Sequence, residues 1–149
     1  SLNASRDLYY ASSVDGGKTF ASARKLGDGT WTLNACPMDG GDMTDVGNGR
    51  IDSVWRRQEE IFGVSPGKEE QSLGKGRNPV IVYGSKGRYV AWDDVGTKQA
   101  VLLSPGTSKP VPLGKQSQFV DLASSVGKVV AAWEETRGEQ KVVRVQVFD

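Results

Sequence analysis

A short signal returns three times along this chain at a spacing of about 40 residues, and it restricts the fold more than any other feature. A glycine and a basic residue come first, and a tryptophan follows within six residues. The three copies are Gly49-Arg50 with Trp55, Gly87-Arg88 with Trp92, and Gly127-Lys128 with Trp133. A chain that repeats itself in this way folds into similar units that pack in series. We expect each tryptophan to pack between neighbouring units.

Two further signals keep the same period. Leu73-Gly74 returns as Leu113-Gly114, and Leu26-Gly27 opens that series. Ser65-Pro66-Gly67 returns as Ser104-Pro105-Gly106. A period near 40 residues is typical of β-propeller blades, which are four-stranded antiparallel sheets.

The composition favours an all-β fold and excludes two classes of partner. Nineteen glycines and six prolines are spread over the 149 residues, as expected for short strands joined by tight turns. The longest apolar runs, such as Val80–Tyr83 and Val129–Trp133, are far shorter than the roughly 20 residues of a membrane helix, so no membrane span is predicted. Nineteen basic and eighteen acidic side chains form no basic block, so we expect no nucleic-acid partner.

The chain has no histidine and one cysteine. Ser-His-Asp catalysis, Cys-His catalysis and His-ligated zinc therefore cannot be completed within it. Cys36 alone forms no internal disulfide, and we expect it to be a small buried hydrophobe. The sequence predicts no cofactor and no metal centre.

The repeat divides residues 1–149 into one partial β-propeller domain. Residues 1–27 are expected to end one blade, residues 31–74 and 77–114 to form two blades, and residues 116–149 to form an incomplete blade. Each complete blade has four antiparallel strands, so the chain holds about three to three and a half blades. The thirteen expected strands are Asp7–Ser12, Ala21–Leu26, Pro37–Val46, Arg50–Arg56, Ile61–Ser65, Glu69–Leu73, Val80–Tyr83, Arg88–Asp93, Ala100–Leu103, Pro110–Leu113, Phe119–Ala123, Lys128–Glu134 and Lys141–Phe148.

The segment Ser13–Phe20, with the sequence SVDGGKTF, is predicted to be a hairpin corner. The Asp15 carboxylate can accept hydrogen bonds from backbone N–H groups of the turn, and Gly16-Gly17 can supply positive φ. This segment resembles the Asp box, or BNR repeat, of sialidase-like β-propellers, with Phe20 where that family usually has Trp. In that family the box is a structural corner and carries no chemistry.

The resemblance implies a six-bladed propeller, of which this chain would supply about half. It also implies a secreted or periplasmic protein. The open sheet edges at both ends of the partial ring predict a second chain or self-association to close the propeller.

The resemblance places a ligand site where the connections between blades meet the turns between second and third strands. Arg77, Asn78, Arg56 and Arg57 are the predicted ligand-binding residues, because a guanidinium group matches a ligand carboxylate. Solvated loop charge and ion pairing between blades remain alternatives.

A sialidase also needs an acid/base Asp, a Glu paired with a nucleophilic Tyr, and an arginine near an Arg-Ile-Pro motif. None can be assigned here, so no catalytic residue is predicted. The expected function is a non-catalytic propeller module that binds a carbohydrate or protein ligand. The alternative is part of an exo-sialidase-like glycoside hydrolase whose remaining catalytic residues lie outside this chain.

Three aspartates lie next to a Gly-Gly pair in the first complete unit. Asp39, Asp42 and Asp45 suggest calcium by their carboxylates, but polarity of the inner strand or turn capping explains them as well. Gly40-Gly41 predicts a bulge or a close approach of two backbones.

Overall fold

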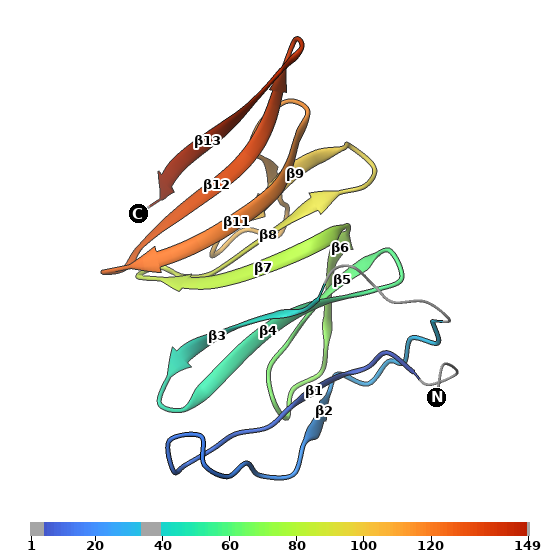
Figure 1. The fold of residues 1–149 in the computed structure, drawn as a ribbon, viewed down its shortest axis with the longest axis vertical. Coiled ribbons are helices and arrows are strands. Elements are labelled where there is room, and N and C mark those ends of the chain that lie inside the picture. The colour runs from blue at the N-terminus through green and yellow to red at the C-terminus, as the bar shows by residue number, and fades with distance from the viewer. Residues whose placement is uncertain (1–4, 34–39, 149) are drawn as a thin grey trace.

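A computed structural model describes residues 5–33 and 40–148 of the chain. These residues form strands, turns and loops and no helix, which confirms the all-β prediction. The strands make four antiparallel sheets that follow one another along the chain (Figure 1). The described part of the chain has no helix with the length and apolarity that a membrane crossing requires.

The sheets are numbered in chain order. Sheet 1 contains β1 (Leu8–Tyr10) and β2 (Arg24–Leu26). Sheet 2 contains β3 (Asp42–Gly47), β4 (Arg50–Arg57), β5 (Glu60–Val64) and β6 (Gln71–Lys75). Sheet 3 contains β7 (Arg77–Gly84), β8 (Gly87–Asp94), β9 (Gln99–Leu103) and β10 (Val111–Pro112). Sheet 4 contains β11 (Ser117–Ser125), β12 (Lys128–Arg137) and β13 (Gln140–Phe148). Within each sheet, every strand pairs with its neighbour in the sequence.

The thirteen strands lie where the repeat predicted them, with shifted ends. The strand expected at Pro37–Val46 begins at Asp42, and residues 37–39, like Cys36, lie outside the described residues. The strands of sheet 1 are shorter than expected, because their pairing ends at Tyr10 and Arg24. The Gly40-Gly41 expectation holds as a close approach: a Cβ atom at Gly41 would lie 2.9 Å from the Val54 carbonyl oxygen. The irregular register of β3 falls later, between Asp45 and Gly47.

The tryptophans of the repeat join neighbouring sheets, as predicted. Trp92 of sheet 3 is fully buried in a cluster with Val54 and Ile61 of sheet 2. Its indole Nε1 donates a hydrogen bond to the Lys75 carbonyl at the end of sheet 2, at 3.2 Å. A Cβ at Gly76 would lie 2.1 Å from the Trp92 ring, so only glycine allows the chain to pass there.

The same packing recurs at the other two boundaries. Trp133 of sheet 4 is buried in a cluster with Tyr89, Ala100 and Leu102 of sheet 3. Trp55 of sheet 2 is buried beside Leu26 of sheet 1. Each boundary therefore has one buried indole from the later sheet.

The first strands of sheets 2, 3 and 4 lie side by side and point in the same direction (Figure 1). A side chain connects two of these strands directly: Asp42 of β3 accepts a hydrogen bond from the Ile81 backbone N–H of β7, at 2.9 Å. This hydrogen bond fixes the position of β7 relative to β3.

The turn between β1 and β2 has the predicted chemistry. Asp15 accepts hydrogen bonds from the backbone N–H groups of Lys18 and Thr19, at 3.0 and 2.9 Å, and from the Thr19 hydroxyl, at 2.6 Å. Gly16 and Gly17 adopt φ of 74° and 86°. Phe20 is exposed in this structure, so it contributes little to the core.

We expect replacement of Thr19 by Val to raise the Asp15 pKa. Hydrogen bonds from Thr19 lower this pKa far below its ordinary value of 3.8. Because the folded turn favours the ionised carboxyl, its contribution to stability is present above the ordinary pKa and is lost as the pH falls through the folded-state pKa. NMR titration of the Asp15 carboxyl carbon measures the shift, and an identical pKa in the wild type and Thr19→Val contradicts this assignment.

We expect Trp92→Ala to destabilise the protein by about 3–5 kcal/mol, because it removes a buried indole and leaves a cavity between two sheets. Chemical denaturation followed by circular dichroism measures the change. Phe20→Ala is the matched control, since it truncates an exposed aromatic ring and should cost at most about 0.5 kcal/mol. Equal losses for the two variants would show that the indole is not the connecting element described here.

Candidate functional site

The connection that enters sheet 3 lies against a turn of sheet 2. The Gly76 backbone N–H donates a hydrogen bond to the Glu59 carbonyl in the β4–β5 turn, at 2.8 Å. The connections between sheets therefore meet the turns between second and third strands at one end of the structure. We call this end the loop end.

Arg77 and Asn78 begin β7 at the loop end. Arg77 is exposed, and its guanidinium makes no hydrogen bond or ion pair with another described residue. Asn78 has φ of 51° at a bulge between Arg77 and Val80, and its amide donates to Asp93 Oδ2 at 2.8 Å. Asn78 thus holds the start of β7 against β8, while Arg77 remains accessible to a ligand.

Sheet 4 repeats this arrangement. The Gln118 amide donates to Glu134 Oε1 at 2.7 Å, beside a register shift between Gln118 and Asp121. The Lys141 ammonium donates to the same Glu134 oxygen at 2.8 Å. These hydrogen bonds, that of Lys141 foremost, lower the Glu134 pKa. An amide bound to a carboxylate is therefore a repeated structural device at the loop end.

Arg56 and Arg57 end β4 and stack on aromatic rings. The Arg56 guanidinium carbon lies 5.3 Å from the centre of the Trp31 ring. Arg57 lies 3.9 Å over the Phe62 ring and forms an ion pair with Glu70 at 2.5 Å. The ion pair and the stacking give Arg57 a structural role, so of the four predicted residues Arg77 has the most accessible charge.

A hollow of about 900 Å³ lies at the loop end between sheets 3 and 4. The β8–β9 turn, the β10–β11 connection and the end of β12 form its walls. Three basic side chains line it, Lys98, Lys115 and Arg137, and one acidic side chain, Glu135. Arg137 bonds Glu135 at 2.6 Å and lowers its pKa.

Lys98 and Lys115 were not among the residues predicted from the sequence. The repeat could have indicated Lys115, because it follows Leu113-Gly114 as Lys75 follows Leu73-Gly74. Neither lysine has a hydrogen bond or ion pair with another described residue, so the hollow carries an excess of positive charge.

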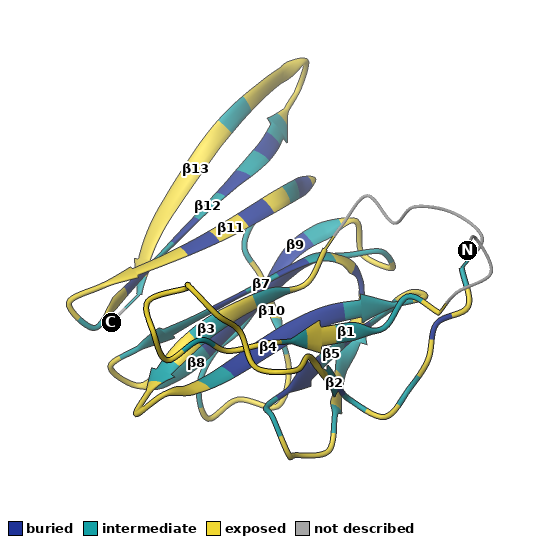
Figure 2. Ribbon diagram, turned by 60° about the horizontal axis from the view of Figure 1, so that its bottom comes forward, coloured by how far each residue is buried: buried dark blue, intermediate teal, exposed yellow. Residues whose placement is uncertain are grey.

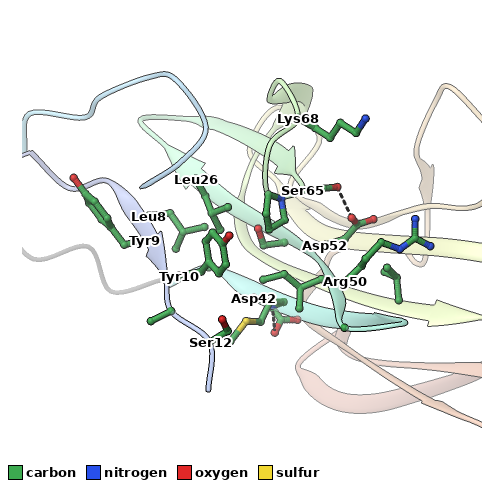
Figure 3. A pocket seen from close by; sticks show the side chains of 18 of the residues that line it. Leu8, Tyr9, Tyr10, Ser12, Leu26, Asp42, Arg50, Asp52, Ser65 and Lys68 are labelled. Carbon is green, nitrogen blue, oxygen red and sulfur yellow. Dashed lines mark hydrogen bonds between the residues drawn. The ribbon is translucent and has the colours of Figure 1, made fainter. Parts of the chain in front are cut away.

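A second cavity, of about 870 Å³, lies between sheets 1 and 2 (Figure 3). Asp52 is buried beside it and accepts hydrogen bonds from the Ser65 hydroxyl and, at 3.0 Å, from the Tyr83 hydroxyl. Asp52 and Tyr83 belong to different sheets, so no local pattern could have placed them together. The available signal was a polar pair, Asp52-Ser53, between the apolar residues Ile51 and Val54 of β4.

Asp42 and Asp45, considered for calcium, are hydrogen-bond acceptors here. Asp42 bonds the Ile81 and Met43 backbone N–H groups, and Asp45 bonds the Gly47 N–H. Asp39 lies outside the described residues. The described residues contain no group of three side chains arranged to hold a metal ion.

No protein-family model matches the chain, and no curated protein or solved structure does so either. We therefore infer the function from the geometry of the sheets and from the charges at the loop end.

We expect Asp52→Asn to lower the Tyr83 pKa. Burial raises this pKa above the ordinary value of 10.0, and the hydrogen bond and charge of Asp52 raise it further. The variant removes the charge and leaves the burial, so the pKa should fall part of the way towards the ordinary value. Tyrosinate absorbance against pH measures it, with Tyr83→Phe identifying the transition among the four tyrosines. An unchanged transition would mean that the carboxylate does not act on the phenol.

Proposed function

We propose that the four sheets are blades of a sialidase-like β-propeller, two of them complete and two partial. Three observations support this proposal. Both four-stranded sheets have the strand order of the sequence, the first strands β3, β7 and β11 lie side by side, and Asp15 is hydrogen-bonded as in an Asp-box corner. A secreted or periplasmic location is part of the same proposal and rests on the sequence resemblance.

We propose further that the chain is a non-catalytic module that binds an anionic carbohydrate, or an acidic protein surface, at the loop end. The observation that carries this proposal is the excess of positive charge in the hollow between sheets 3 and 4. Lys98 and Lys115 line this hollow, and Arg77 begins β7 at the same end. None of the three forms an ion pair with a described carboxylate. A guanidinium group and two ammonium groups provide the donors that a carboxylate or sulfate requires.

The carboxylates at this end suit binding better than hydrolysis. A glycosidase needs one carboxyl group with a raised pKa to act as general acid. Hydrogen bonds from Lys141 and Arg137 lower the pKa of Glu134 and Glu135 respectively, so both stay ionised near neutral pH. The rival function, part of an exo-sialidase-like hydrolase, would have to draw its acid from residues other than Glu134 and Glu135.

We expect Arg77→Ala to weaken binding of a sialylated oligosaccharide by ~1–3 kcal/mol, which is roughly a 5- to 150-fold rise in Kd. Lys115→Ala should weaken binding as well, by a smaller factor because ammonium contacts are less directional. Isothermal titration calorimetry measures both.

Lys86→Ala is the matched control, since Lys86 is exposed in the β7–β8 turn at the opposite end of β7. Equal affinity in the wild type and Arg77→Ala would refute the site. Turnover of a fluorogenic sialoside by this chain, abolished by changing one loop-end carboxylate, would refute the non-catalytic proposal.

A further inference from the structure

The first strands of sheets 3 and 4 begin with the same bulge. The register shifts between Arg77 and Val80 in β7 and between Gln118 and Asp121 in β11. In both strands the residue before the shift lies opposite the residue that follows the tryptophan of the repeat. Arg77 and Gln118 therefore occupy equivalent positions, and the two residues inside each bulge are equivalent as well.

The first residue inside each bulge has a left-handed backbone, and the two sheets use different residue types there. Asn78 has φ of 51° and Phe119 has φ of 54°. Asparagine adopts positive φ several times more readily than most residues, whereas for a bulky side chain this conformation is an outlier. Sheet 4 therefore carries a conformational cost at Phe119 that sheet 3 avoids with Asn78.

The Phe119 ring does not offset this cost by packing within the described part of the chain. Phe119 is 61% exposed, and its ring makes no aromatic or cation–π contact with another described residue. It lies between the buried residues Ser117 and Val120, in a strand that has both buried and exposed residues (Figure 2). Strained backbone that serves no packing is a feature of binding sites.

The exposure of Phe119 is a property of its place at the bulge. Asn78, at the equivalent position, is only half-buried although sheet 4 packs on sheet 3. The bulge thus lies at the margin of the packed face. The Gln118 amide bonds Glu134 at 2.7 Å and Val120 is buried, so both residues that flank Phe119 are held in place.

Phe119 and Arg77 lie near the starts of neighbouring strands at the loop end. β7 and β11 lie side by side and run in the same direction (Figure 1). Arg77 is equivalent to Gln118, so Phe119 is one position further along its own strand. Because packed sheets lie ~10 Å apart, one oligosaccharide can contact both side chains.

The surroundings of Phe119 are polar. The four residues before it, Lys115–Gln118, all have polar side chains, and the described residues that line the hollow beside Lys115 are polar or charged. A single apolar ring among polar groups matches a pyranose, which has an apolar face of C–H groups and a rim of hydroxyls. A protein interface instead has a buried apolar centre. The residues around Phe119 therefore favour a carbohydrate over an acidic protein surface.

We propose that Phe119 is a ligand-binding residue that stacks on a sugar ring of an anionic oligosaccharide at the loop end. This assignment rests on the function proposed above and narrows its ligand to a carbohydrate. Phe119 supplies apolar contact for the ring, and Arg77 supplies positive charge for a carboxylate of the same ligand. Because the bulge already holds Phe119 in its exposed position, little conformational freedom is lost when the ligand binds.

Phe119→Asn separates binding from folding. The variant places in sheet 4 the residue that sheet 3 has at this position, so the thermal midpoint should stay the same or rise. The Kd for a sialylated oligosaccharide should nevertheless rise roughly 5- to 30-fold, as expected for the loss of apolar contact with part of an aromatic ring. Thermal denaturation and isothermal titration calorimetry measure the two quantities. Phe119→Tyr keeps the ring and should keep the wild-type affinity.

Salt distinguishes the contribution of the ring from that of the charge. The loss of affinity in Phe119→Asn should be the same at low and high salt, whereas the loss in Arg77→Ala should shrink as salt screens the charge. Val126→Asn is the matched control, because Val126 is also an exposed apolar residue with positive φ and directly follows β11 at its opposite end. It should bind as the wild type does.

The outcomes separate this assignment from the function on which it rests. A wild type that does not bind the oligosaccharide overturns both. Binding that Arg77→Ala weakens and Phe119→Asn leaves unchanged overturns the assignment of Phe119 alone. A lower thermal midpoint in Phe119→Asn, or an equal loss of affinity in Val126→Asn, would mean that Phe119 acts through the fold and also overturns it. If Phe119→Asn does not fold, Phe119→Gly replaces it, since glycine adopts positive φ readily.

Discussion

The packing of one tryptophan against the end of the preceding sheet is the interaction on which the arrangement of sheets depends. Trp92 occupies the boundary between sheets 2 and 3, and its indole N–H binds the last carbonyl of sheet 2. Gly76 lets the chain cross directly over the ring before β7 begins. Gly114 lies in the same way against the Trp133 indole, so these two boundaries set the distance between sheets in a similar way. The geometry of the loop end depends on the packing at these boundaries.

The sequence was sufficient to predict strands and pairing, because both follow from local patterns that repeat. The tryptophan and Leu-Gly series placed the thirteen strands, and Asp15 with two glycines predicted the first turn. The strand ends were less accurate where bulges interrupt the pairing near Asn78 and Gln118. Gln116 and Phe119 have positive φ there, a conformation that neither residue type favours. Strand pairing repeats with the period of the sequence, whereas each bulge occurs at one position only.

The candidate site was predicted in part for the same reason. Arg77 follows a repeated signal, and its position at the loop end could be inferred from the order of strands. The ion pair between Arg57 and Glu70 could not be predicted, because it depends on how β4 faces the segment before β6. The Asp52 carboxylate bonds Tyr83 of sheet 3 and Ser65 after β5, and only the packing of sheet 3 on sheet 2 shows this contact.

The packing of the sheets in series also affects the order in which parts of the molecule unfold. Sheet 3 is covered on both faces, and Val90, Ala91, Trp92 and Leu102 at its centre have no solvent exposure. Sheets 1 and 4 each have one covered face, as end repeats of a linear array do. Local opening is cheapest where fewest contacts are broken, so amide protection should be graded outward from β8. The chain therefore has a stable middle and fraying ends, and its cooperativity depends on what covers those ends.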